Sequence, residues 1–194
     1  MTDDPYVYPG TTILRNRLGI KDARLLDYYE RELVTQRQRE GVPAGQFDLD
    51  HLKAIHHHLF EDVYEWAGQV RTVEISKGGW QFQFCRFIDT GMADVHRRLE
   101  GSGFLQGLPR EDFAAGAGQI IGDVNYVHPF RDGNGRVQLQ YLKQLAAQAG
   151  HEIDLTKLDA AAWLEASKAA HQGRYEGMGA EILKALVNGV CEYT

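Results

Sequence analysis

The sequence predicts a mainly α-helical protein, a compact helical bundle that carries one β-hairpin. Over most of the 194 residues, apolar side chains recur every three or four positions, the spacing of helices with one buried face. Residues 70–84 instead alternate polar and apolar side chains, as a strand does. No linker or internal repeat interrupts the pattern. We therefore expect a single domain over residues 1–194.

Three helices are predicted in the N-terminal half of the chain, over residues 22–40, 48–60 and 89–99. Each begins at an aspartate whose carboxylate can accept hydrogen bonds from the free N–H groups of the first turn: Asp22, Asp48 and Asp89. The apolar spacing of the first helix places three side chains on its buried stripe: Leu26, Tyr29 and Leu33.

Four more helices are predicted in the C-terminal half, over residues 110–127, 134–149, 159–171 and 177–188. The first two carry the most continuous apolar patterns, so we expect them deep in the core. Gly150 is suited to end the second as a C-terminal cap. Asp159 is suited to begin the third.

The alternating segment VRTVEISKGGWQFQF, residues 70–84, is predicted to form two short strands joined by Gly78 and Gly79. A lone hairpin is only marginally stable in water. This one must therefore lean on the helices or present an edge that pairs with another chain.

Composition excludes several classes of protein. The chain has 27 acidic and 21 basic residues, a net charge of -6, and so lacks the basic face with which proteins coat nucleic acid. Cys85 and Cys191 belong to no CxxC pair, which argues against a disulfide framework or a zinc site. The start has no secretory pattern, and no apolar run could span a bilayer. We expect a cytoplasmic protein with no direct nucleic-acid or membrane partner, although a secreted effector would escape these criteria.

The run HPFRDGNGR, residues 128–136, contains the ingredients of a phosphate site. Gly133, Asn134 and Gly135 open a helix, whose free N–H groups and partial positive charge attract phosphate. Arg136 can add a forked donor to the same phosphates. The run lacks the spacing of a Walker loop, so an ordinary nucleotide-hydrolase loop is not expected.

The same run also supplies a base and a metal ligand. His128 can accept a proton from an attacking hydroxyl near neutral pH. Asp132, beside a bound polyphosphate, is a natural ligand for Mg²⁺. We expect Phe130 to turn inward and anchor the loop. Each residue alone has an ordinary structural explanation, such as a helix cap or a turn, but their order indicates transfer of a phosphate-containing group to a hydroxyl.

The run resembles the signature of Fic domains, His-x-Phe-x-(Asp/Glu)-Gly-Asn-Gly-Arg-x-x-Arg, and matches it through Arg136. Upstream, FDLDHLKAIHHHLFEDVYEWAGQVRTVEISKGG is similar to the helix, Trp-Ala-Gly turn and hairpin that precede this motif in the family. The opening DPYVYPGTTILRNRLGI is similar to the start of stand-alone bacterial Fic proteins. The resemblance covers nearly the whole chain and implies a Fic-like bundle with a hairpin flap.

The resemblance implies transfer of AMP from ATP to a hydroxyl side chain of a target protein, with release of pyrophosphate. It implies that His128 is the general base and that Asp132 holds Mg²⁺ on the phosphates. Arg136 would grip the outer phosphates, while phosphate oxygens would be bound by Asn134 and by the backbone amides of Gly133 and Gly135.

The resemblance also assigns residues outside the motif. The hairpin would be a flap that pairs with the backbone of the target, through Thr72, Val73, Glu74, Ile75, Ser76, Lys77, Gly78 and Gly79. Arg174 and Tyr175 follow the penultimate predicted helix, where Fic domains often line the adenine pocket.

One residue departs from the family pattern. The final arginine of the motif falls at Leu139, three residues after Arg136 and on the same helical face. The alternative reading is therefore a degenerate Fic scaffold that binds nucleotide or a partner without efficient transfer. A further alternative is another donor, with transfer of UMP, phosphocholine or phosphate.

The resemblance bears on regulation too. Many Fic enzymes are inhibited by a helix with the motif (Ser/Thr)-x-x-x-Glu-(Gly/Asn). The residues four before the Glu-Gly pairs are Gln36, His96 and Gln172, so this chain lacks that motif. The expected class is a Fic toxin with a separate small antitoxin that carries the motif. Its target would be the ATPase subunit of a type II topoisomerase.

The sequence contains one other conspicuous cluster, His56-His57-His58. Neighbouring side chains on a helix point about 100° apart, so the three cannot chelate one metal. We expect scattered, partly exposed imidazoles.

Overall fold

Two antiparallel helices, α4 (Arg110–Val127) and α5 (Asn134–Ala149), run through the middle of the computed structural model, which describes residues 4–187. They begin and end where the sequence predicts. Apolar side chains on both are fully buried, among them Phe113, Ile121 and Leu142. The turn between these helices is the motif loop, so the core itself positions the motif.

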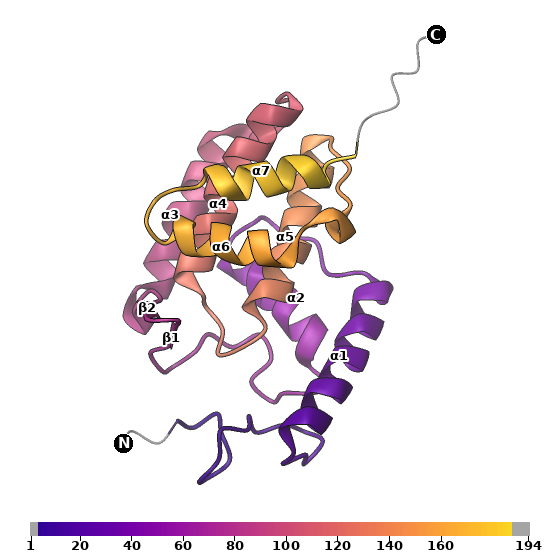
Figure 1. Ribbon diagram of the computed structural model, residues 1–194, viewed down its shortest axis with the longest axis vertical. Helices are drawn as coiled ribbons and strands as arrows, with labels where there is room; N and C mark the ends of the chain where they lie inside the picture. Colours follow the sequence, from indigo (N-terminus) through magenta and orange to yellow (C-terminus); the bar gives the residue numbers. More distant parts are fainter. Residues whose placement is uncertain (1–3, 188–194) are drawn as a thin grey trace.

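Helices α6 (Ala160–Ala170) and α7 (Glu176–Ala185) cover α4 on one side (Figure 1). A Cβ atom added to Gly118 would lie 2.6 Å from the backbone nitrogen of Gly179. Only glycine permits α4 and α7 to approach so closely. Asp159 caps α6 as predicted. The predicted end of α7 at residue 188, and Cys191, lie outside the described residues.

Helices α1 (Ala23–Glu40) and α2 (Leu49–Phe60) form the other side of the bundle (Figure 1). Both predicted caps are confirmed, since Asp22 accepts from the N–H of Leu25 and Asp48 from that of His51, each at 2.8 Å. The predicted stripe of α1 is wrong at Tyr29, which is exposed. The buried positions are Leu26, Glu30 and Val34, because α1 turns a carboxylate inward to meet an arginine of the motif.

The remaining elements are short except for α3 (Ile88–Gly101). This helix has Phe87 as its N-cap, so Asp89 lies in the first turn and is not the cap that the sequence predicted. Single turns of 3-10 helix occupy Cys85–Phe87, Gly103–Leu105 and Leu155–Lys157. Among the helices of residues 4–187, none has the length and hydropathy of a membrane span.

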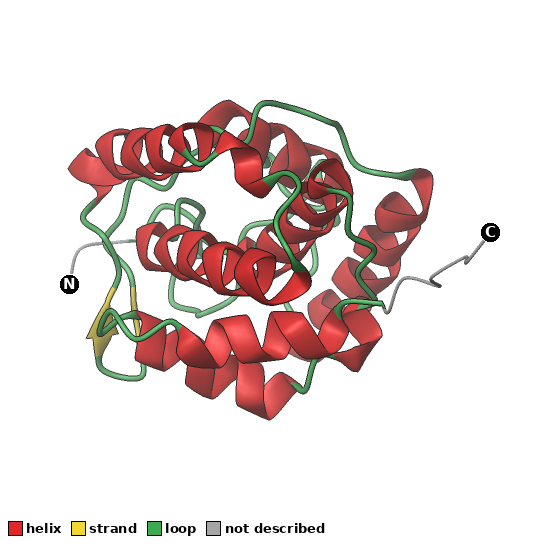
Figure 2. Cartoon of the chain, turned by 90° about the horizontal axis from the view of Figure 1, so that it is seen from above, coloured by secondary structure: helices red, strands yellow, loops and turns green. Residues whose placement is uncertain are grey.

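The predicted hairpin is present but shorter than expected. Strands β1 (Ser76–Lys77) and β2 (Trp80–Gln81) pair antiparallel, with Ser76 opposite Gln81. Gly78 and Gly79 form the turn with φ of 58° and 85°, values that favour glycine. The strands project at one edge of the bundle (Figure 2). Outside the strands, residues 70–84 are held by backbone hydrogen bonds, such as the one from the N–H of Phe82 to the carbonyl of Ile75, and by the side chains of Arg71 and Glu74.

Candidate active site

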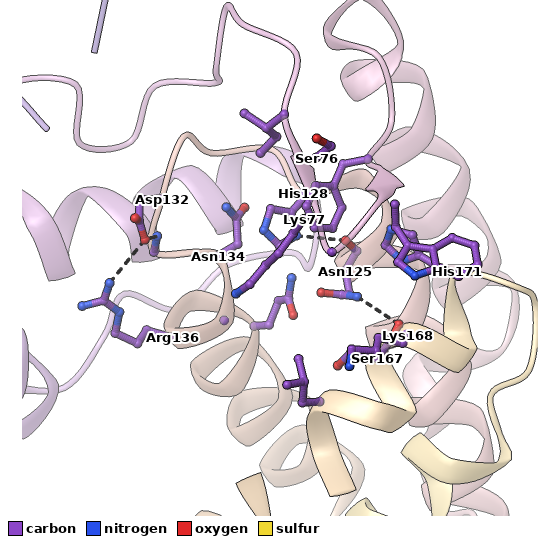
Figure 3. A pocket seen from close by; sticks show the side chains of 18 of the residues that line it. Ser76, Lys77, Asn125, His128, Asp132, Asn134, Arg136, Ser167, Lys168 and His171 are labelled. Atoms are coloured by element: carbon purple, nitrogen blue, oxygen red, sulfur yellow. Dashed lines mark hydrogen bonds and ion pairs between the residues drawn. The ribbon is translucent and has the colours of Figure 1, made fainter. Parts of the chain in front are cut away.

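A cavity of about 1140 Å³ opens between the motif loop, the hairpin and α6 (Figure 3). The structure brings together there all the predicted motif residues: His128, Asp132, Gly133, Asn134, Gly135 and Arg136. The hairpin contributes Glu74 through Gly78 to the opposite wall. Base, anion cradle and flap, which the sequence separates by more than 40 residues, therefore share one space.

His128 caps the C-terminus of α4 in a left-handed conformation, with φ of 47°. Its Nδ1 lies 3.0 Å from the carbonyl oxygen of Asn125. Because a carbonyl only accepts, Nδ1 carries the proton and Nε2 is left as the basic nitrogen. The ring of Phe82, from the hairpin, stacks on the imidazole with centroids 3.7 Å apart.

Burial lowers the pKa of His128 to about 4, and the nearby charges of Arg71 and Lys77 add to the effect. The imidazole is therefore neutral at pH 7, the form that can accept a proton. Its orientation is fixed on two sides, by Asn125 and by Phe82.

Arg71 is a fully buried side chain that ties the base of the hairpin to the catalytic turn. Its Nε donates to the carbonyl of His128 at 2.8 Å, and its Nη1 donates to that of Val73 at 2.9 Å. Its backbone N–H donates to Pro129 at 2.9 Å. Arg71 thus holds the strained backbone of the turn. Sequence reasoning missed it, and the only signal was a charge inside an apolar alternating segment.

The interior of the loop is filled by Phe130, which is buried as predicted. The ring of His56 packs against it, tilted by 30°, with centroids 4.0 Å apart. The two nitrogens of His56 meet the carbonyl of Asp132 at 3.1 Å and the N–H of Gly68 at 2.8 Å. The expectation of partly exposed imidazoles is therefore wrong for His56. This side chain supports the loop, and burial lowers its pKa to about 3.

Two residues close the loop at the start of α5. Asn134 accepts from the N–H of Phe130 at 3.0 Å and donates to the carbonyl of Phe130 at 2.8 Å. Gly133 has φ of 81°, and an added Cβ would lie 2.5 Å from the ring of Phe60. The Asn134 side chain is thus committed to the loop, which leaves its backbone N–H for a ligand.

The N-terminus of α5 is open. The Asp132 carboxylate accepts from the N–H of Gly133 at 2.5 Å, and no other side chain of the described residues caps the helix. A Cβ on Gly135 would meet nothing within 4 Å. Free N–H groups at a helix start, with room for a ligand beside them, form an anion site.

Arg136 is held in place beside this anion site. Its Nη1 lies 2.5 Å from Glu30 of α1, and its guanidinium lies 4.6 Å above the ring of Phe60. The hydroxyl of Tyr64 donates to the other oxygen of Glu30. Glu30 and Tyr64 therefore orient Arg136, and neither was singled out from the sequence.

Asp132 is the residue that could hold Mg²⁺. Its side chain is half exposed, at 50%, on the rim of the anion site. Residues 4–187 contain no group of three or more His, Cys, Asp or Glu side chains arranged to hold a metal. A single carboxylate suits Mg²⁺, which takes one or two carboxylates and completes its shell with water and substrate phosphates.

Two predicted residues lie elsewhere. Tyr175 donates to Asp123 at 2.6 Å and packs on Gly122, away from the cavity, and Arg174 is exposed beside Gln172. The adenine-pocket prediction for Arg174 and Tyr175 is therefore not supported by position. The wall on that side comes instead from α6, through Trp163, Ser167 and Lys168, and from its C-cap residue His171. Their spacing is that of any helix face, so the sequence offered no signal.

Known proteins resemble this chain in sequence. The model of the Fic/DOC family matches residues 46–146. A probable protein adenylyltransferase of Sinorhizobium fredii is 38% identical over 95% of this chain and 96% of its own. A protein adenylyltransferase of Bartonella schoenbuchensis is 37% identical, and the match spans 39% of that longer protein.

Solved structures of Bartonella effector proteins have the same fold as this chain. The BepC effector of Bartonella tribocorum, solved with AMPPNP, has a TM-score of 0.84 and 26% identity, over 94% of this chain and 96% of that one. The N-terminal Fic domain of a Bartonella quintana effector, solved with ADP, has a TM-score of 0.84 and 28% identity, over 94% of each chain.

Proposed function

The chain belongs to the Fic/DOC family, and we propose that it is a protein adenylyltransferase that transfers AMP from ATP to a hydroxyl side chain of a target protein. One observation carries the proposal. A neutral imidazole with one free nitrogen shares a cavity with the start of α5 and an oriented arginine. The names of the relatives and their bound nucleotides support the same activity.

In the proposed reaction, Nε2 of His128 takes the proton of the target hydroxyl. The hydroxyl oxygen forms a bond to the α-phosphorus of ATP, and the bond to the bridging oxygen of pyrophosphate breaks. The N–H groups at the start of α5 stabilise the charge on the phosphate oxygens, and Arg136 binds the outer phosphates. Mg²⁺ held by Asp132 would neutralise phosphate charge when bound.

The far end of the nucleotide would lie against α6. Trp163 offers an aromatic surface, and Ser167 and Lys168 offer polar groups on the same wall. An aromatic face with a few polar groups is typical of a site for a nucleobase and its ribose. This assignment replaces the one predicted for Arg174 and Tyr175.

The hairpin would dock the target. Its strands are exposed, and Glu74 through Gly78 line the cavity beside His128. An extended target segment paired with residues 72–79 would present its hydroxyl to the imidazole by β-augmentation. We also propose that residues 1–194 form one Fic domain, supported by the single connected core that the described residues share.

Differential labelling tests the proposed reaction. The chain is incubated with bacterial lysate, Mg²⁺ and ATP that is labelled on either the α- or the γ-phosphate. We expect protein-bound label only from the α-phosphate. Label from the γ-phosphate would show phosphate transfer instead. Intact mass of the labelled protein with UTP and CDP-choline as competing donors separates UMP and phosphocholine transfer from AMP transfer.

A specific observation favours the second candidate, a scaffold that binds nucleotide without efficient transfer. Leu139 lines the cavity where the family motif has a second arginine. Leu139→Arg distinguishes the two functions. If the wild-type chain binds ATP without transferring label and Leu139→Arg transfers none either, the protein is a nucleotide-binding scaffold. If Leu139→Arg transfers label, the missing arginine had limited transfer in the wild type.

The physiological role that we propose is that of a cytoplasmic toxin with its antitoxin in trans. The absence of the (Ser/Thr)-x-x-x-Glu-(Gly/Asn) motif from the sequence supports it. The proposed target is the ATPase subunit of a type II topoisomerase. Expression in bacteria should arrest growth, and co-expression of a neighbouring small protein with the motif should relieve it. Mass analysis of the topoisomerase subunit tests the target.

A further inference from the structure

One of the positive charges that line the cavity has no ion-pair partner among residues 4–187. Four lysine or arginine side chains line it: Lys77, Arg131, Arg136 and Lys168. Arg131 pairs with Asp4 at 2.8 Å, and Lys168 pairs with Glu165 at 2.6 Å. Arg136 is bound to Glu30. Within residues 4–187, Lys77 alone among the four forms no ion pair.

Lys77 is exposed, but it also lines the cavity. It lies on β1, and Figure 3 shows its side chain extending from the hairpin across the cavity, past His128, towards the start of α5. After burial, its charge is among the effects that lower the pKa of His128. The only acidic side chain of the hairpin, Glu74, is engaged by Arg71 at 3.4 Å.

The opposite wall lacks a cation where one is expected. Leu139 lies one turn after Arg136 on α5 and presents an apolar side chain to the cavity. A triphosphate carries several negative charges into a partly enclosed space, where each unneutralised charge is costly. Arg136 alone is a weak complement for them, because Glu30 already shares its guanidinium.

We propose that Lys77 of the hairpin binds the outer phosphates of the nucleotide and supplies the positive charge that Leu139 fails to provide. This inference rests on the proposed function, since it assumes a triphosphate at the start of α5. The hairpin then has two roles, because it completes the nucleotide site and docks the target. Bound nucleotide would draw the hairpin towards the motif loop before the target arrives.

Calorimetry without any target protein tests the proposal, because a role of Lys77 in docking alone would not alter nucleotide affinity. The titrants are α,β-methylene ATP, which cannot release pyrophosphate, and AMP. Lys77→Met should weaken binding of the triphosphate about tenfold, and binding of AMP by less than about twofold. Lys77→Arg should retain most of the affinity. Lys143→Met, which removes an exposed lysine on the outer face of α5, is the matched control and should bind like wild type.

A double-mutant cycle makes the test sharper. Leu139→Arg should restore triphosphate affinity to Lys77→Met while adding little to the wild type, since either cation would meet the same phosphates. Unchanged triphosphate affinity of Lys77→Met, beside a wild type that binds, would overturn this inference and leave the proposed function standing. A wild type that binds no triphosphate would overturn both.

Discussion

The motif loop and the hairpin face each other across one cavity, yet they are built in opposite ways. Several contacts hold the loop: Arg71 binds the carbonyl of His128, Asn134 binds both backbone groups of Phe130, and the ring of His56 packs against that of Phe130. The hairpin has two residue pairs between its strands, and all four strand residues are exposed.

The contrast follows from what each region must do. Phosphoryl chemistry is accelerated by groups that already point to where charge develops, so the loop is fixed before substrate arrives. A surface that pairs with an extended segment needs free N–H and C=O groups, and such an edge cannot also be buried. We therefore expect changes in the loop to affect catalysis and stability, and changes in the hairpin to affect binding.

The largest effect should come from the base itself. His128→Ala should lower the rate of AMP transfer by about 10²–10⁴-fold, the usual contribution of general acid–base catalysis. The free energy of unfolding should change little, because the imidazole has few partners beyond Asn125 and Phe82. Label transfer and urea unfolding of the same preparation check both parts. A variant that loses activity only because it has unfolded would not support the assignment.

Arg71 should show the largest effect on stability. Arg71→Met leaves several buried carbonyls without a donor, and we expect a loss of about 3–5 kcal/mol in the free energy of unfolding. Arg71→Lys should recover part of the stability but less of the transfer rate, because a lysine cannot reproduce the fork that fixes His128. The matched control is Lys77→Met, for which urea unfolding should match wild type. Equal stability of Arg71→Met and wild type would contradict the clamp.

A substitution at Gly133 tests how rigid the loop is without removing any polar group. Gly133→Ala places a Cβ 2.5 Å from the ring of Phe60 at a residue with φ of 81°, so we expect a loss of about 2–4 kcal/mol. Gly135→Ala is its control, because a Cβ there meets nothing within 4 Å. Thermal unfolding should separate the two variants. Equal losses would show that the loop is softer than its contacts indicate.

The pH dependence should also distinguish the loop from an ordinary surface. The pKa of His128 is near 4, so the base stays neutral until the pH falls to about 4. The acid limb of kcat/KM should therefore lie well below pH 6.5. Burial lowers the pKa of His128 in the folded state below that of the unfolded chain, so the unfolded chain binds more protons between the two values. Stability is then fully present above about pH 6.5 and is lost as pH falls towards 4. His128→Ala should reduce this acid loss in urea unfolding.

The smallest effect on stability should come from the hairpin. The carbonyl of Ile75 accepts from the N–H of Phe82 at 3.2 Å, while its own N–H is bonded to no described residue. Ile75→Pro removes that N–H and should raise KM for the target several-fold, with unfolding changed by less than about 0.5 kcal/mol. Ile75→Ala controls for the lost side chain. Unchanged KM in Ile75→Pro would argue against pairing at this edge.

Local signals in the sequence sufficed for most of the fold. Helices α4 and α5 have the predicted bounds because apolar periodicity and Gly150 act within one helix. The face of α1 was predicted wrongly at Tyr29, because a carboxylate, Glu30, was drawn inward by Arg136, which is distant in the sequence. Periodicity cannot anticipate a buried ion pair of this kind.

In the candidate site too, the residues that are close in the sequence were predicted and the distant ones were not. The motif residues are contiguous, so their order alone indicated an anion site with a base. Their supports come from elsewhere, Arg71 from the base of the hairpin and His56 from α2, and only tertiary packing brings them to the loop. The wall of α6 was missed for the same reason, since nothing in the sequence around Trp163 and Lys168 shows that this helix faces the motif loop.

One measurement tests the division between a fixed loop and an adaptable hairpin most directly: a crystal structure of the chain with Mg²⁺ and α,β-methylene ATP. We predict the phosphates on the backbone N–H groups of residues 133–135, with His128, Asn134 and Arg71 in the contacts described above, and the hairpin shifted towards the nucleotide. A nucleotide bound elsewhere, or a loop that rearranges while the hairpin stays in place, would contradict the account.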